Sequence, residues 1–99
     1  MKLYSVRLSG AAETDLIRLY EWVHGAAGEA VADRFYGRLR QSIESLQYFP
    51  ERGVLRESIA PAARLLVVGN HVVLYRVAGN AVDVMRVVYG AVDLTRLLR

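Results

Sequence analysis

Apolar residues recur at helical spacing in two stretches of the N-terminal half. The first stretch comprises Ala12, Leu16, Leu19, Tyr20 and Val23, and the second comprises Ala32, Phe35, Tyr36, Leu39, Ile43 and Leu46. Ser9 precedes the first stretch and can cap a helix, Gly25 and Gly28 separate the two stretches, and Pro50 ends the second. The pattern predicts two amphipathic helices in an antiparallel hairpin, each needing a further apolar surface to cover its stripe.

The pattern changes to Val- and Leu-rich strands from Arg64 onward. Gly69-Asn70 and Gly79-Asn80 suit two-residue hairpin turns, and they predict three antiparallel strands at residues 64–68, 71–78 and 81–89. The first eight residues alternate as a strand does, residues 51–63 are expected to form a loop, and Asp93 can cap a short helical tail. These elements predict an α+β fold in one domain, residues 1–99, with the order strand, helical hairpin, antiparallel sheet and tail.

Two-residue turns fix the pairing of these strands, and the pairing divides the side chains between two faces. The predicted pairs are Arg64 with Tyr75, Tyr75 with Val84, Val73 with Arg86, and His71 with Val88. The face expected to accept the helices carries Leu65, Val67, Val72, Leu74, Met85 and Val87, with an Arg76–Asp83 pair at its far end. The other carries Arg64, His71, Tyr75 and Arg86 among Leu66, Val68, Val73, Val77, Val82, Val84 and Val88. Because burying an unpaired guanidinium is costly, we expect this second face to stay open until another chain covers its valines.

The composition limits the classes of protein to which this chain can belong. The chain has 99 residues, of which 54% are hydrophobic, but no apolar run reaches the ~20 residues of a membrane span. Arg7 lies where a signal peptide would be apolar, so a cytoplasmic protein is expected. With no cysteine and only two histidines, no metal or other cofactor is expected. The net charge of +3 is compatible with nucleic acid or an acidic protein segment as partner, and equally with an ordinary basic domain.

Several segments, in their order along the chain, resemble the RelE/ParE family of toxins. They are Ala12-Glu13-Thr14-Asp15-Leu16 with Tyr20, Phe49-Pro50-Glu51-Arg52-Gly53, Arg64 to Gly69, His71-Val72-Val73-Leu74-Tyr75-Arg76-Val77, and Arg86-Val87-Val88-Tyr89-Gly90 with Asp93-Leu94. The resemblance implies the RelE/ParE fold and the toxin of a type II toxin-antitoxin system. It also implies growth arrest and a hetero-oligomer with a ParD-like or RelB-like antitoxin, encoded by the adjacent gene. We expect this antitoxin to cover the open sheet face, where it would contact Arg64, Leu66, His71, Val73, Tyr75, Val84 and Arg86.

The resemblance implies two alternative mechanisms. RelE-like members cut messenger RNA on the ribosome, whereas ParE-like members inhibit DNA gyrase. RNA cleavage needs cations for the phosphate and a base for the 2'-hydroxyl, and here Arg64, Arg86 and Tyr89 would supply them. The chain departs from the RelE-like pattern, because Ala91 and Val92 replace basic residues after the last strand. It also lacks the histidine that YoeB-type members place before the tyrosine, and it has only one lysine.

These departures favour a ParE-like gyrase inhibitor without catalytic residues of its own. Its expected target contacts are Arg86, Tyr89, Asp93, Arg96, Leu97 and Arg99. The alternatives are the ribosome-dependent endoribonuclease and a chain that has lost toxicity and only binds its antitoxin. Among the aromatic residues, Tyr20, Phe35 and Tyr36 have core spacing, whereas Trp22 and Tyr48 could equally form a platform on which bases stack.

Overall fold

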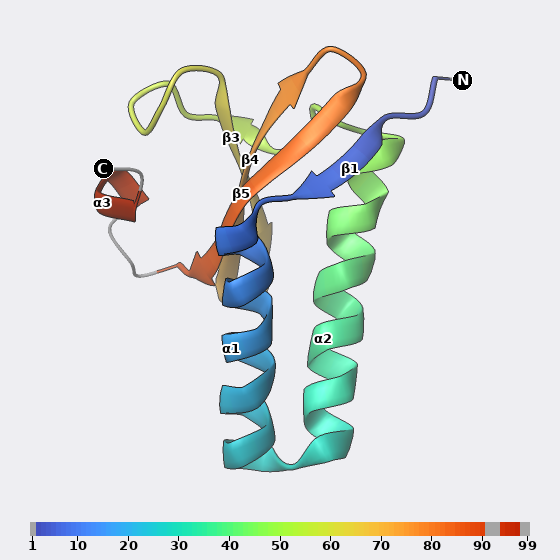
Figure 1. Ribbon diagram of the computed structural model, residues 1–99, viewed down its shortest axis with the longest axis vertical. Coiled ribbons are helices and arrows are strands. Elements are labelled where there is room, and N and C mark those ends of the chain that lie inside the picture. Colours follow the sequence, from blue (N-terminus) through green and yellow to red (C-terminus); the bar gives the residue numbers. More distant parts are fainter. Residues whose placement is uncertain (1, 91–93, 98–99) are drawn as a thin grey trace.

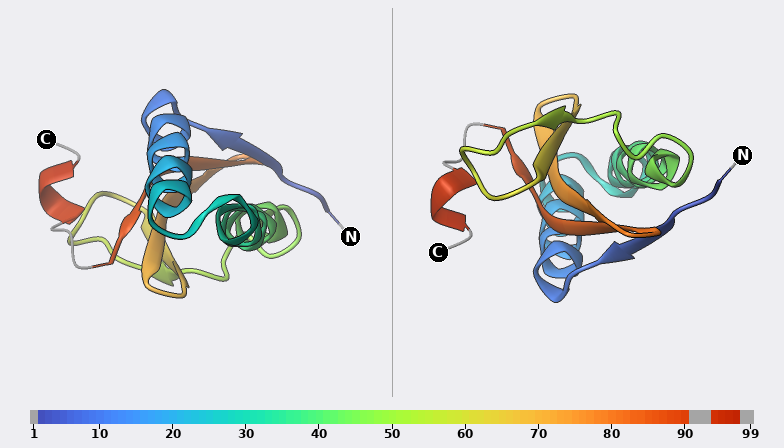
Figure 2. Two further views of the ribbon diagram at one scale, coloured as in Figure 1. Left: turned by 90° about the horizontal axis from the view of Figure 1, so that it is seen from below. Right: turned by 90° about the horizontal axis from the view of Figure 1, so that it is seen from above.

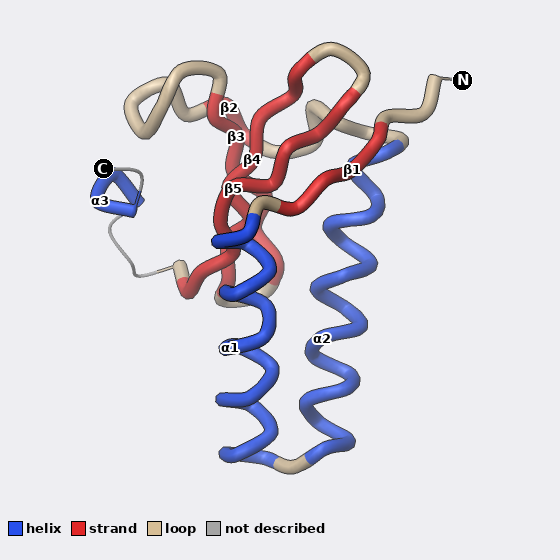
Figure 3. The backbone as a smooth tube through the Cα atoms, viewed as in Figure 1, coloured by secondary structure: helices blue, strands red, loops and turns tan. Residues whose placement is uncertain are grey.

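The computed structural model describes residues 2–90 and 94–97. Within these residues, a hairpin of two helices packs against one face of a twisted five-stranded sheet (Figures 1 and 2). The elements, coloured by type in Figure 3, are β1 (Ser5–Leu8), α1 (Gly10–Ala27), α2 (Glu29–Glu44), η1 (Ser45–Gln47), β2 (Val54–Leu55), β3 (Ala63–Val68), β4 (His71–Ala78), β5 (Ala81–Tyr89) and α3 (Leu94–Leu97). The sheet order is β1-β5-β4-β3-β2, with β1 parallel to β5 and the other pairs antiparallel. The predicted α+β architecture is confirmed.

The helical hairpin begins as its sequence predicts. The Ser9 hydroxyl accepts a hydrogen bond from the Ala12 amide at 3.0 Å and so caps α1. Gly28 separates the helices and has a φ of 89°, which glycine adopts without strain. The second helix ends earlier than Pro50, because α2 tightens into a 3₁₀ turn at Ser45, whose hydroxyl donates to the Ser42 carbonyl at 2.6 Å. No helix of the described residues is long and apolar enough to cross a bilayer.

The three C-terminal strands agree with the prediction to within one residue. Both hairpin turns are as tight as expected, and Gly69 and Gly79 adopt φ values of 62° and 59°. The loop after α2 contains the short edge strand β2, which was not predicted because two residues are too few to show an alternating pattern.

The pairing of β4 with β5 departs from the prediction at Met85. Pairing follows the prediction from the turn as far as Val84, but Met85 is then an extra residue on β5 and forms a β-bulge. The pairs beyond it are Leu74 with Arg86, Val73 with Val87, Val72 with Val88, and His71 with Tyr89. The predicted pairs of Val73 with Arg86 and His71 with Val88 are therefore wrong. A one-residue insertion moves every later side chain to the opposite face of the sheet.

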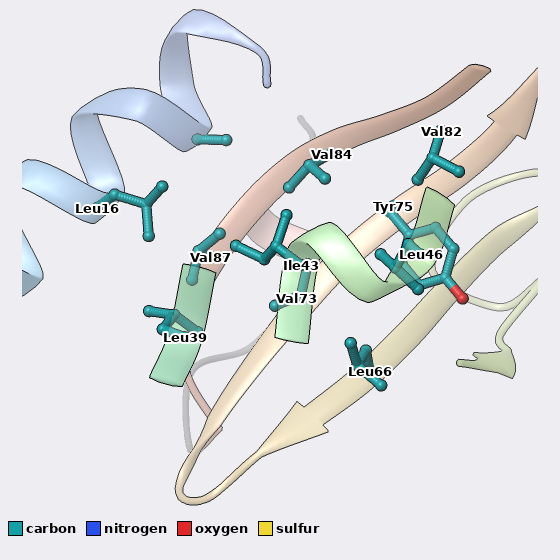
Figure 4. Packing of buried hydrophobic residues seen from close by; sticks show 11 residues of the cluster. Leu16, Leu39, Ile43, Leu46, Leu66, Val73, Tyr75, Val82, Val84 and Val87 are labelled. Atoms are coloured by element: carbon teal, nitrogen blue, oxygen red, sulfur yellow. The ribbon is translucent and has the colours of Figure 1, made fainter. Parts of the chain in front are cut away.

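The helices cover the sheet face that was expected to be open. In Figure 4 the buried cluster joins Leu16, Leu39, Ile43 and Leu46 to the sheet residues Leu66, Val73, Tyr75, Val82, Val84 and Val87. Val67, expected beneath the helices, is 68% exposed instead. Neither of the two arginines expected to keep this face open is buried without a partner. The bulge moves Arg86 to the other face, and Arg64 reaches carbonyl groups at the edge of the sheet.

Arg76 lies opposite Asp83 as predicted, but the expected ion pair between their side chains does not form. The parallel pairing of β1 with β5 places Arg7 opposite Asp83, and the Arg7 Nε donates to Asp83 Oδ1 at 2.7 Å. This exposed interaction raises the pKa of Arg7 above its ordinary value. Arg76 instead lies 3.6 Å from the Met85 sulfur. Asp83 therefore forms its ion pair with Arg7, which is 76 residues away in the sequence, and not with its cross-strand neighbour Arg76.

Candidate functional site

An ion pair joins α1 to the end of β5. The Asp15 carboxylate accepts hydrogen bonds from Arg86 Nε at 2.7 Å and from Arg86 Nη2 at 2.8 Å. It also accepts one from the Val87 amide at 2.9 Å. Asp15 is 8% exposed and the Arg86 side chain 22%. The hydrogen bonds that Arg86 donates to Asp15 raise the pKa of Arg86 above its ordinary value. The Arg86 guanidinium is thus bound within the fold.

Asp15 and Ser9 bind backbone groups on the part of the β5 edge that does not pair with β1. β1 pairs with β5 only as far as Val84. Beyond that point, the Ser9 amide donates to the Val84 carbonyl at 2.9 Å and the Ser9 hydroxyl to the Met85 carbonyl at 2.8 Å. Asp15 then accepts the Val87 amide. The start of α1 therefore supplies the partners that a longer strand would have given this edge.

Tyr75 and Arg64 fix the loop that follows α2. The buried Tyr75 hydroxyl donates to the Pro50 carbonyl and accepts from the Gly53 amide, both at 2.7 Å. Burial raises the pKa of Tyr75, so the hydroxyl stays protonated. Arg64 Nη1 donates to the Gly53 carbonyl at 2.9 Å and to the Glu51 carbonyl at 3.3 Å. A Cβ on Gly53 would lie 2.7 Å from the Tyr75 ring, so only glycine fits this close approach.

Exposed aromatic residues gather where β5 ends beside α1. The Tyr89 ring, on a residue 53% exposed, lies 5.8 Å from that of His71, which in turn lies 5.1 Å from that of Phe35. Burial lowers the pKa of His71 and favours its neutral form. A hollow of about 540 Å³, which we name the Trp22 surface, is lined by Leu19, Trp22, Asn70, His71 and Tyr89. Trp22 is 70% exposed and lies among apolar and aromatic neighbours, an arrangement typical of a binding surface.

The structure separates the residues predicted to contact a target. Arg86 binds Asp15, whereas Tyr89 is exposed at the end of β5. Arg96 is exposed on α3, and Leu97 ends that helix. The remaining two predicted contacts, Asp93 and Arg99, lie outside the described residues. Contact with a target stays a prediction for all six.

Most residues predicted to bind an antitoxin lie in the core. Leu66, Val73, Tyr75 and Val84 are at most 5% exposed, beneath the helices. A partner could reach them only by displacing the hairpin. Arg64 and Arg86 are bound to the loop and to α1 respectively, and His71 borders the Trp22 surface. The expectation of an open face at these positions is wrong, because the helices occupy it.

Asp15 is the site residue that sequence reasoning missed. It lies three residues after Ala12 and four before Leu19, so it falls within the apolar stripe of α1. A carboxylate within such a stripe needs a buried cation or amide partner, and this signal could have identified it. Its partner Arg86 is 71 residues away, which no local pattern indicates.

The groups that RNA cleavage would require can be located in the structure. Both arginines proposed for a phosphate are already bound to protein groups, Arg64 to carbonyls and Arg86 to Asp15. Among the described residues, no three histidine, aspartate or glutamate side chains could together bind a metal ion. Tyr89 and neutral His71 line an apolar hollow together with Asn70.

Two solved structures with this architecture come from toxin-antitoxin systems. A chain of the chromosomal ParDE TA system from P. aeruginosa is similar, with a TM-score of 0.78 and 21% identity, and the match covers 88% of this chain and 96% of that one. A chain of the toxin-antitoxin complex RelBE2 from Mycobacterium tuberculosis is also similar, with a TM-score of 0.69 and 19% identity, over 90% and 93% of the two chains. No curated protein sequence matches the chain. The fold is that of the RelE/ParE class of toxins.

The sequence narrows this class to a family. Residues 6–94 match the family described as ParE toxin of type II toxin-antitoxin system, parDE. The chain belongs to this family, and the resemblance seen in its sequence is confirmed.

Proposed function

We propose that this protein is the toxin of a type II toxin-antitoxin pair that inhibits DNA gyrase in the cytoplasm. In this proposal a ParD-like antitoxin, encoded by the adjacent gene, neutralises it in a hetero-oligomer. Membership of the ParE family supports the toxin function. The observation that favours gyrase over RNA cleavage is that both candidate phosphate-binding arginines are engaged within the fold.

The contacts of Arg64 and Arg86 are the basis for preferring gyrase inhibition to RNA cleavage. A ribonuclease needs preorganised cations directed at the phosphate in the transition state. Arg64 donates to the Gly53 carbonyl at 2.9 Å, and Arg86 forms a two-point ion pair with Asp15 at 2.7 and 2.8 Å. Turning either one toward RNA would leave buried acceptors unpaired, which is costly. The arginines therefore support the fold, and inhibition by binding is the better account.

A supercoiling assay tests the proposal. Relaxed plasmid, ATP and gyrase are incubated with increasing toxin, and we expect supercoiling to decrease. Tyr89→Ala should weaken inhibition, whereas Ile17→Ala, an equally exposed apolar position on α1 at 58%, should not. Undiminished supercoiling at a large molar excess of toxin would refute gyrase inhibition.

The ribonuclease alternative rests on exposed Tyr89, whose ring lies 5.8 Å from that of His71, because a phenol and a neutral imidazole are side chains that can act as general acid and base. Messenger RNA in a translation extract with added toxin distinguishes the two mechanisms, and we expect it to stay intact. Cleavage that is lost in Tyr89→Phe would favour the ribonuclease instead. Normal growth on expression without an antitoxin would indicate the third alternative, a chain that only binds.

The Trp22 surface is the proposed docking site of the antitoxin. Its apolar hollow adjoins a smaller one of about 250 Å³, and both are bordered by Asn70 and His71. Arg38 lines the smaller hollow, so an apolar side chain flanked by carboxylates would suit the pair of hollows. The partner chemistry is therefore that of an acidic amphipathic segment.

Trp22 also provides the measurement, because it is the only tryptophan in the chain. We expect its fluorescence to shift to the blue as the antitoxin covers it. Trp22→Ala should raise the dissociation constant on the order of thirtyfold, measured by calorimetry, since exposed tryptophans at apolar hollows are typical hot spots. Ile17→Ala is the matched control and should change it less than about twofold. Equal effects of the two substitutions would refute this docking site without affecting the gyrase assay.

A further inference from the structure

A second exposed aromatic cluster lies far from the Trp22 surface, where the N-terminal residues pass the end of α2 (Figure 1). We name Tyr4, Tyr48 and Phe49 the aromatic corner. Phe49 is 61% exposed and Tyr48 46%, and their ring centroids lie 6.5 Å apart. Tyr4 packs partly against the core and lines the neighbouring hollow. Phe49 is outside the core cluster, so folding does not account for its apolar ring.

The backbone that presents these rings is fixed. The Tyr4 amide donates to the Gln47 carbonyl at 2.9 Å, which joins the N-terminal segment to the end of the helical hairpin. The Phe49 amide donates to the Ser45 carbonyl at 3.1 Å. On the other side, the Pro50 carbonyl accepts the hydroxyl of Tyr75. A ligand that stacks on the rings would therefore order little additional chain.

Cations lie around the rings. Lys2 Nζ is 5.0 Å from the centroid of the Tyr4 ring. Arg52 lines the same hollow, and its Nη1 donates to the Ser45 hydroxyl at 2.6 Å, which positions the guanidinium. The hollow has a volume of about 530 Å³, and Glu51 is the one carboxylate among its lining residues in the described part of the chain. Two cations and one anion surround an aromatic floor, in a chain whose net charge is +3.

We propose that the aromatic corner binds single-stranded nucleic acid. Bases stack on exposed Phe and Tyr rings whatever their sequence, and phosphates are attracted to nearby Lys and Arg. A base on Phe49 and a neighbouring base on Tyr48 or Tyr4 would place the connecting phosphates near Lys2 and Arg52. Carboxylates of an acidic peptide would also attract these cations, but they would leave the ring faces without stacking partners. This site goes beyond gyrase inhibition and does not depend on it.

Binding of two labelled oligonucleotides tests the site. The 99-residue protein is titrated into fluorescein-labelled dT10 and rU10 at low salt, and fluorescence anisotropy is followed. We expect both oligonucleotides to bind. The ratio of their affinities shows whether RNA or DNA is the preferred strand. Phe49→Ala should weaken binding on the order of tenfold, because one stacked base is lost. Ile17→Ala, at 58% exposure, is the matched control and should leave the affinity unchanged.

Salt dependence separates stacking from charge. Arg52→Gln should make the negative slope of log K against log salt less steep by about 0.7, the contribution of one phosphate contact on a single strand. Phe49→Ala should leave that slope unchanged. Urea unfolding checks that each variant remains folded. The proposal is overturned if neither oligonucleotide binds, or if Phe49→Ala and Ile17→Ala weaken binding equally.

Discussion

Replacing the buried Asp15 with alanine should destabilise the protein more than replacing any exposed charged residue. The substitution removes three hydrogen bonds, two from Arg86 and one from the Val87 amide. It leaves the Arg86 guanidinium, with 22% of its side chain exposed, without its anion. It also leaves the amide of Val87, a residue 1% exposed, without an acceptor.

The expected loss in the free energy of unfolding follows from these contacts. Removing one partner of a buried ion pair costs about 3–5 kcal/mol, and the remaining solvent access of Arg86 reduces this to about 2–4 kcal/mol. A domain of this length has a free energy of unfolding of roughly 5–15 kcal/mol, so the loss is a large fraction of the total. We expect the melting temperature to fall by about 10–30 °C.

Urea denaturation followed by circular dichroism measures this change. A double-mutant cycle with Arg86→Ala should give a coupling free energy on the order of 2 kcal/mol, because the two side chains act as one unit. The exposed Arg7–Asp83 pair is the matched control, with side chains 61% and 37% exposed, and its cycle should show no measurable coupling. A cost below about 0.5 kcal/mol for Asp15→Ala would refute the reasoning, since a surface substitution has that effect.

Three further outcomes can be measured in the same way. Tyr75→Phe should lower the free energy of unfolding by about 1–3 kcal/mol, because the buried Gly53 amide and the half-buried Pro50 carbonyl lose their partner. Gly53→Ala should lower the melting temperature, because its Cβ would lie 2.7 Å from the Tyr75 ring and 2.8 Å from the Leu65 carbonyl. Burial lowers the pKa of His71. The unfolded chain therefore binds a proton first, stability falls as the pH drops below about 6.5, and His71→Gln should reduce this fall in urea midpoints.

The helices and hairpins could be predicted because their signals are local. Ser9 lies three residues from the amide that it caps, and Gly69 and Gly79 lie within the turns that they form. Each signal depends on backbone conformation over a few residues, so the surrounding fold changes it little. The element order and the three C-terminal strands followed from these positions alone.

The candidate site was less predictable, because its contacts join distant segments. The Trp22 surface combines α1 with the β3–β4 turn and the end of β5, and the aromatic corner combines the N-terminal residues with the loop after α2. The sequence did not decide whether Trp22 and Tyr48 pack in the core or form a binding surface. Their exposures of 70% and 46% show that neither lies in the core.

The amino-acid order thus specified which residues form helices, strands and turns, and it carried the family resemblance. Only the tertiary structure decided which face of the sheet packs against the helices. Both faces carry enough valine and leucine to form a core, and one inserted residue at Met85 reverses every side chain after it. Arg86 illustrates this, because only the bulge and the approach of α1 bring its guanidinium to Asp15, 71 residues earlier. Pairing over such distances is set by the burial of the whole domain, which no short segment encodes.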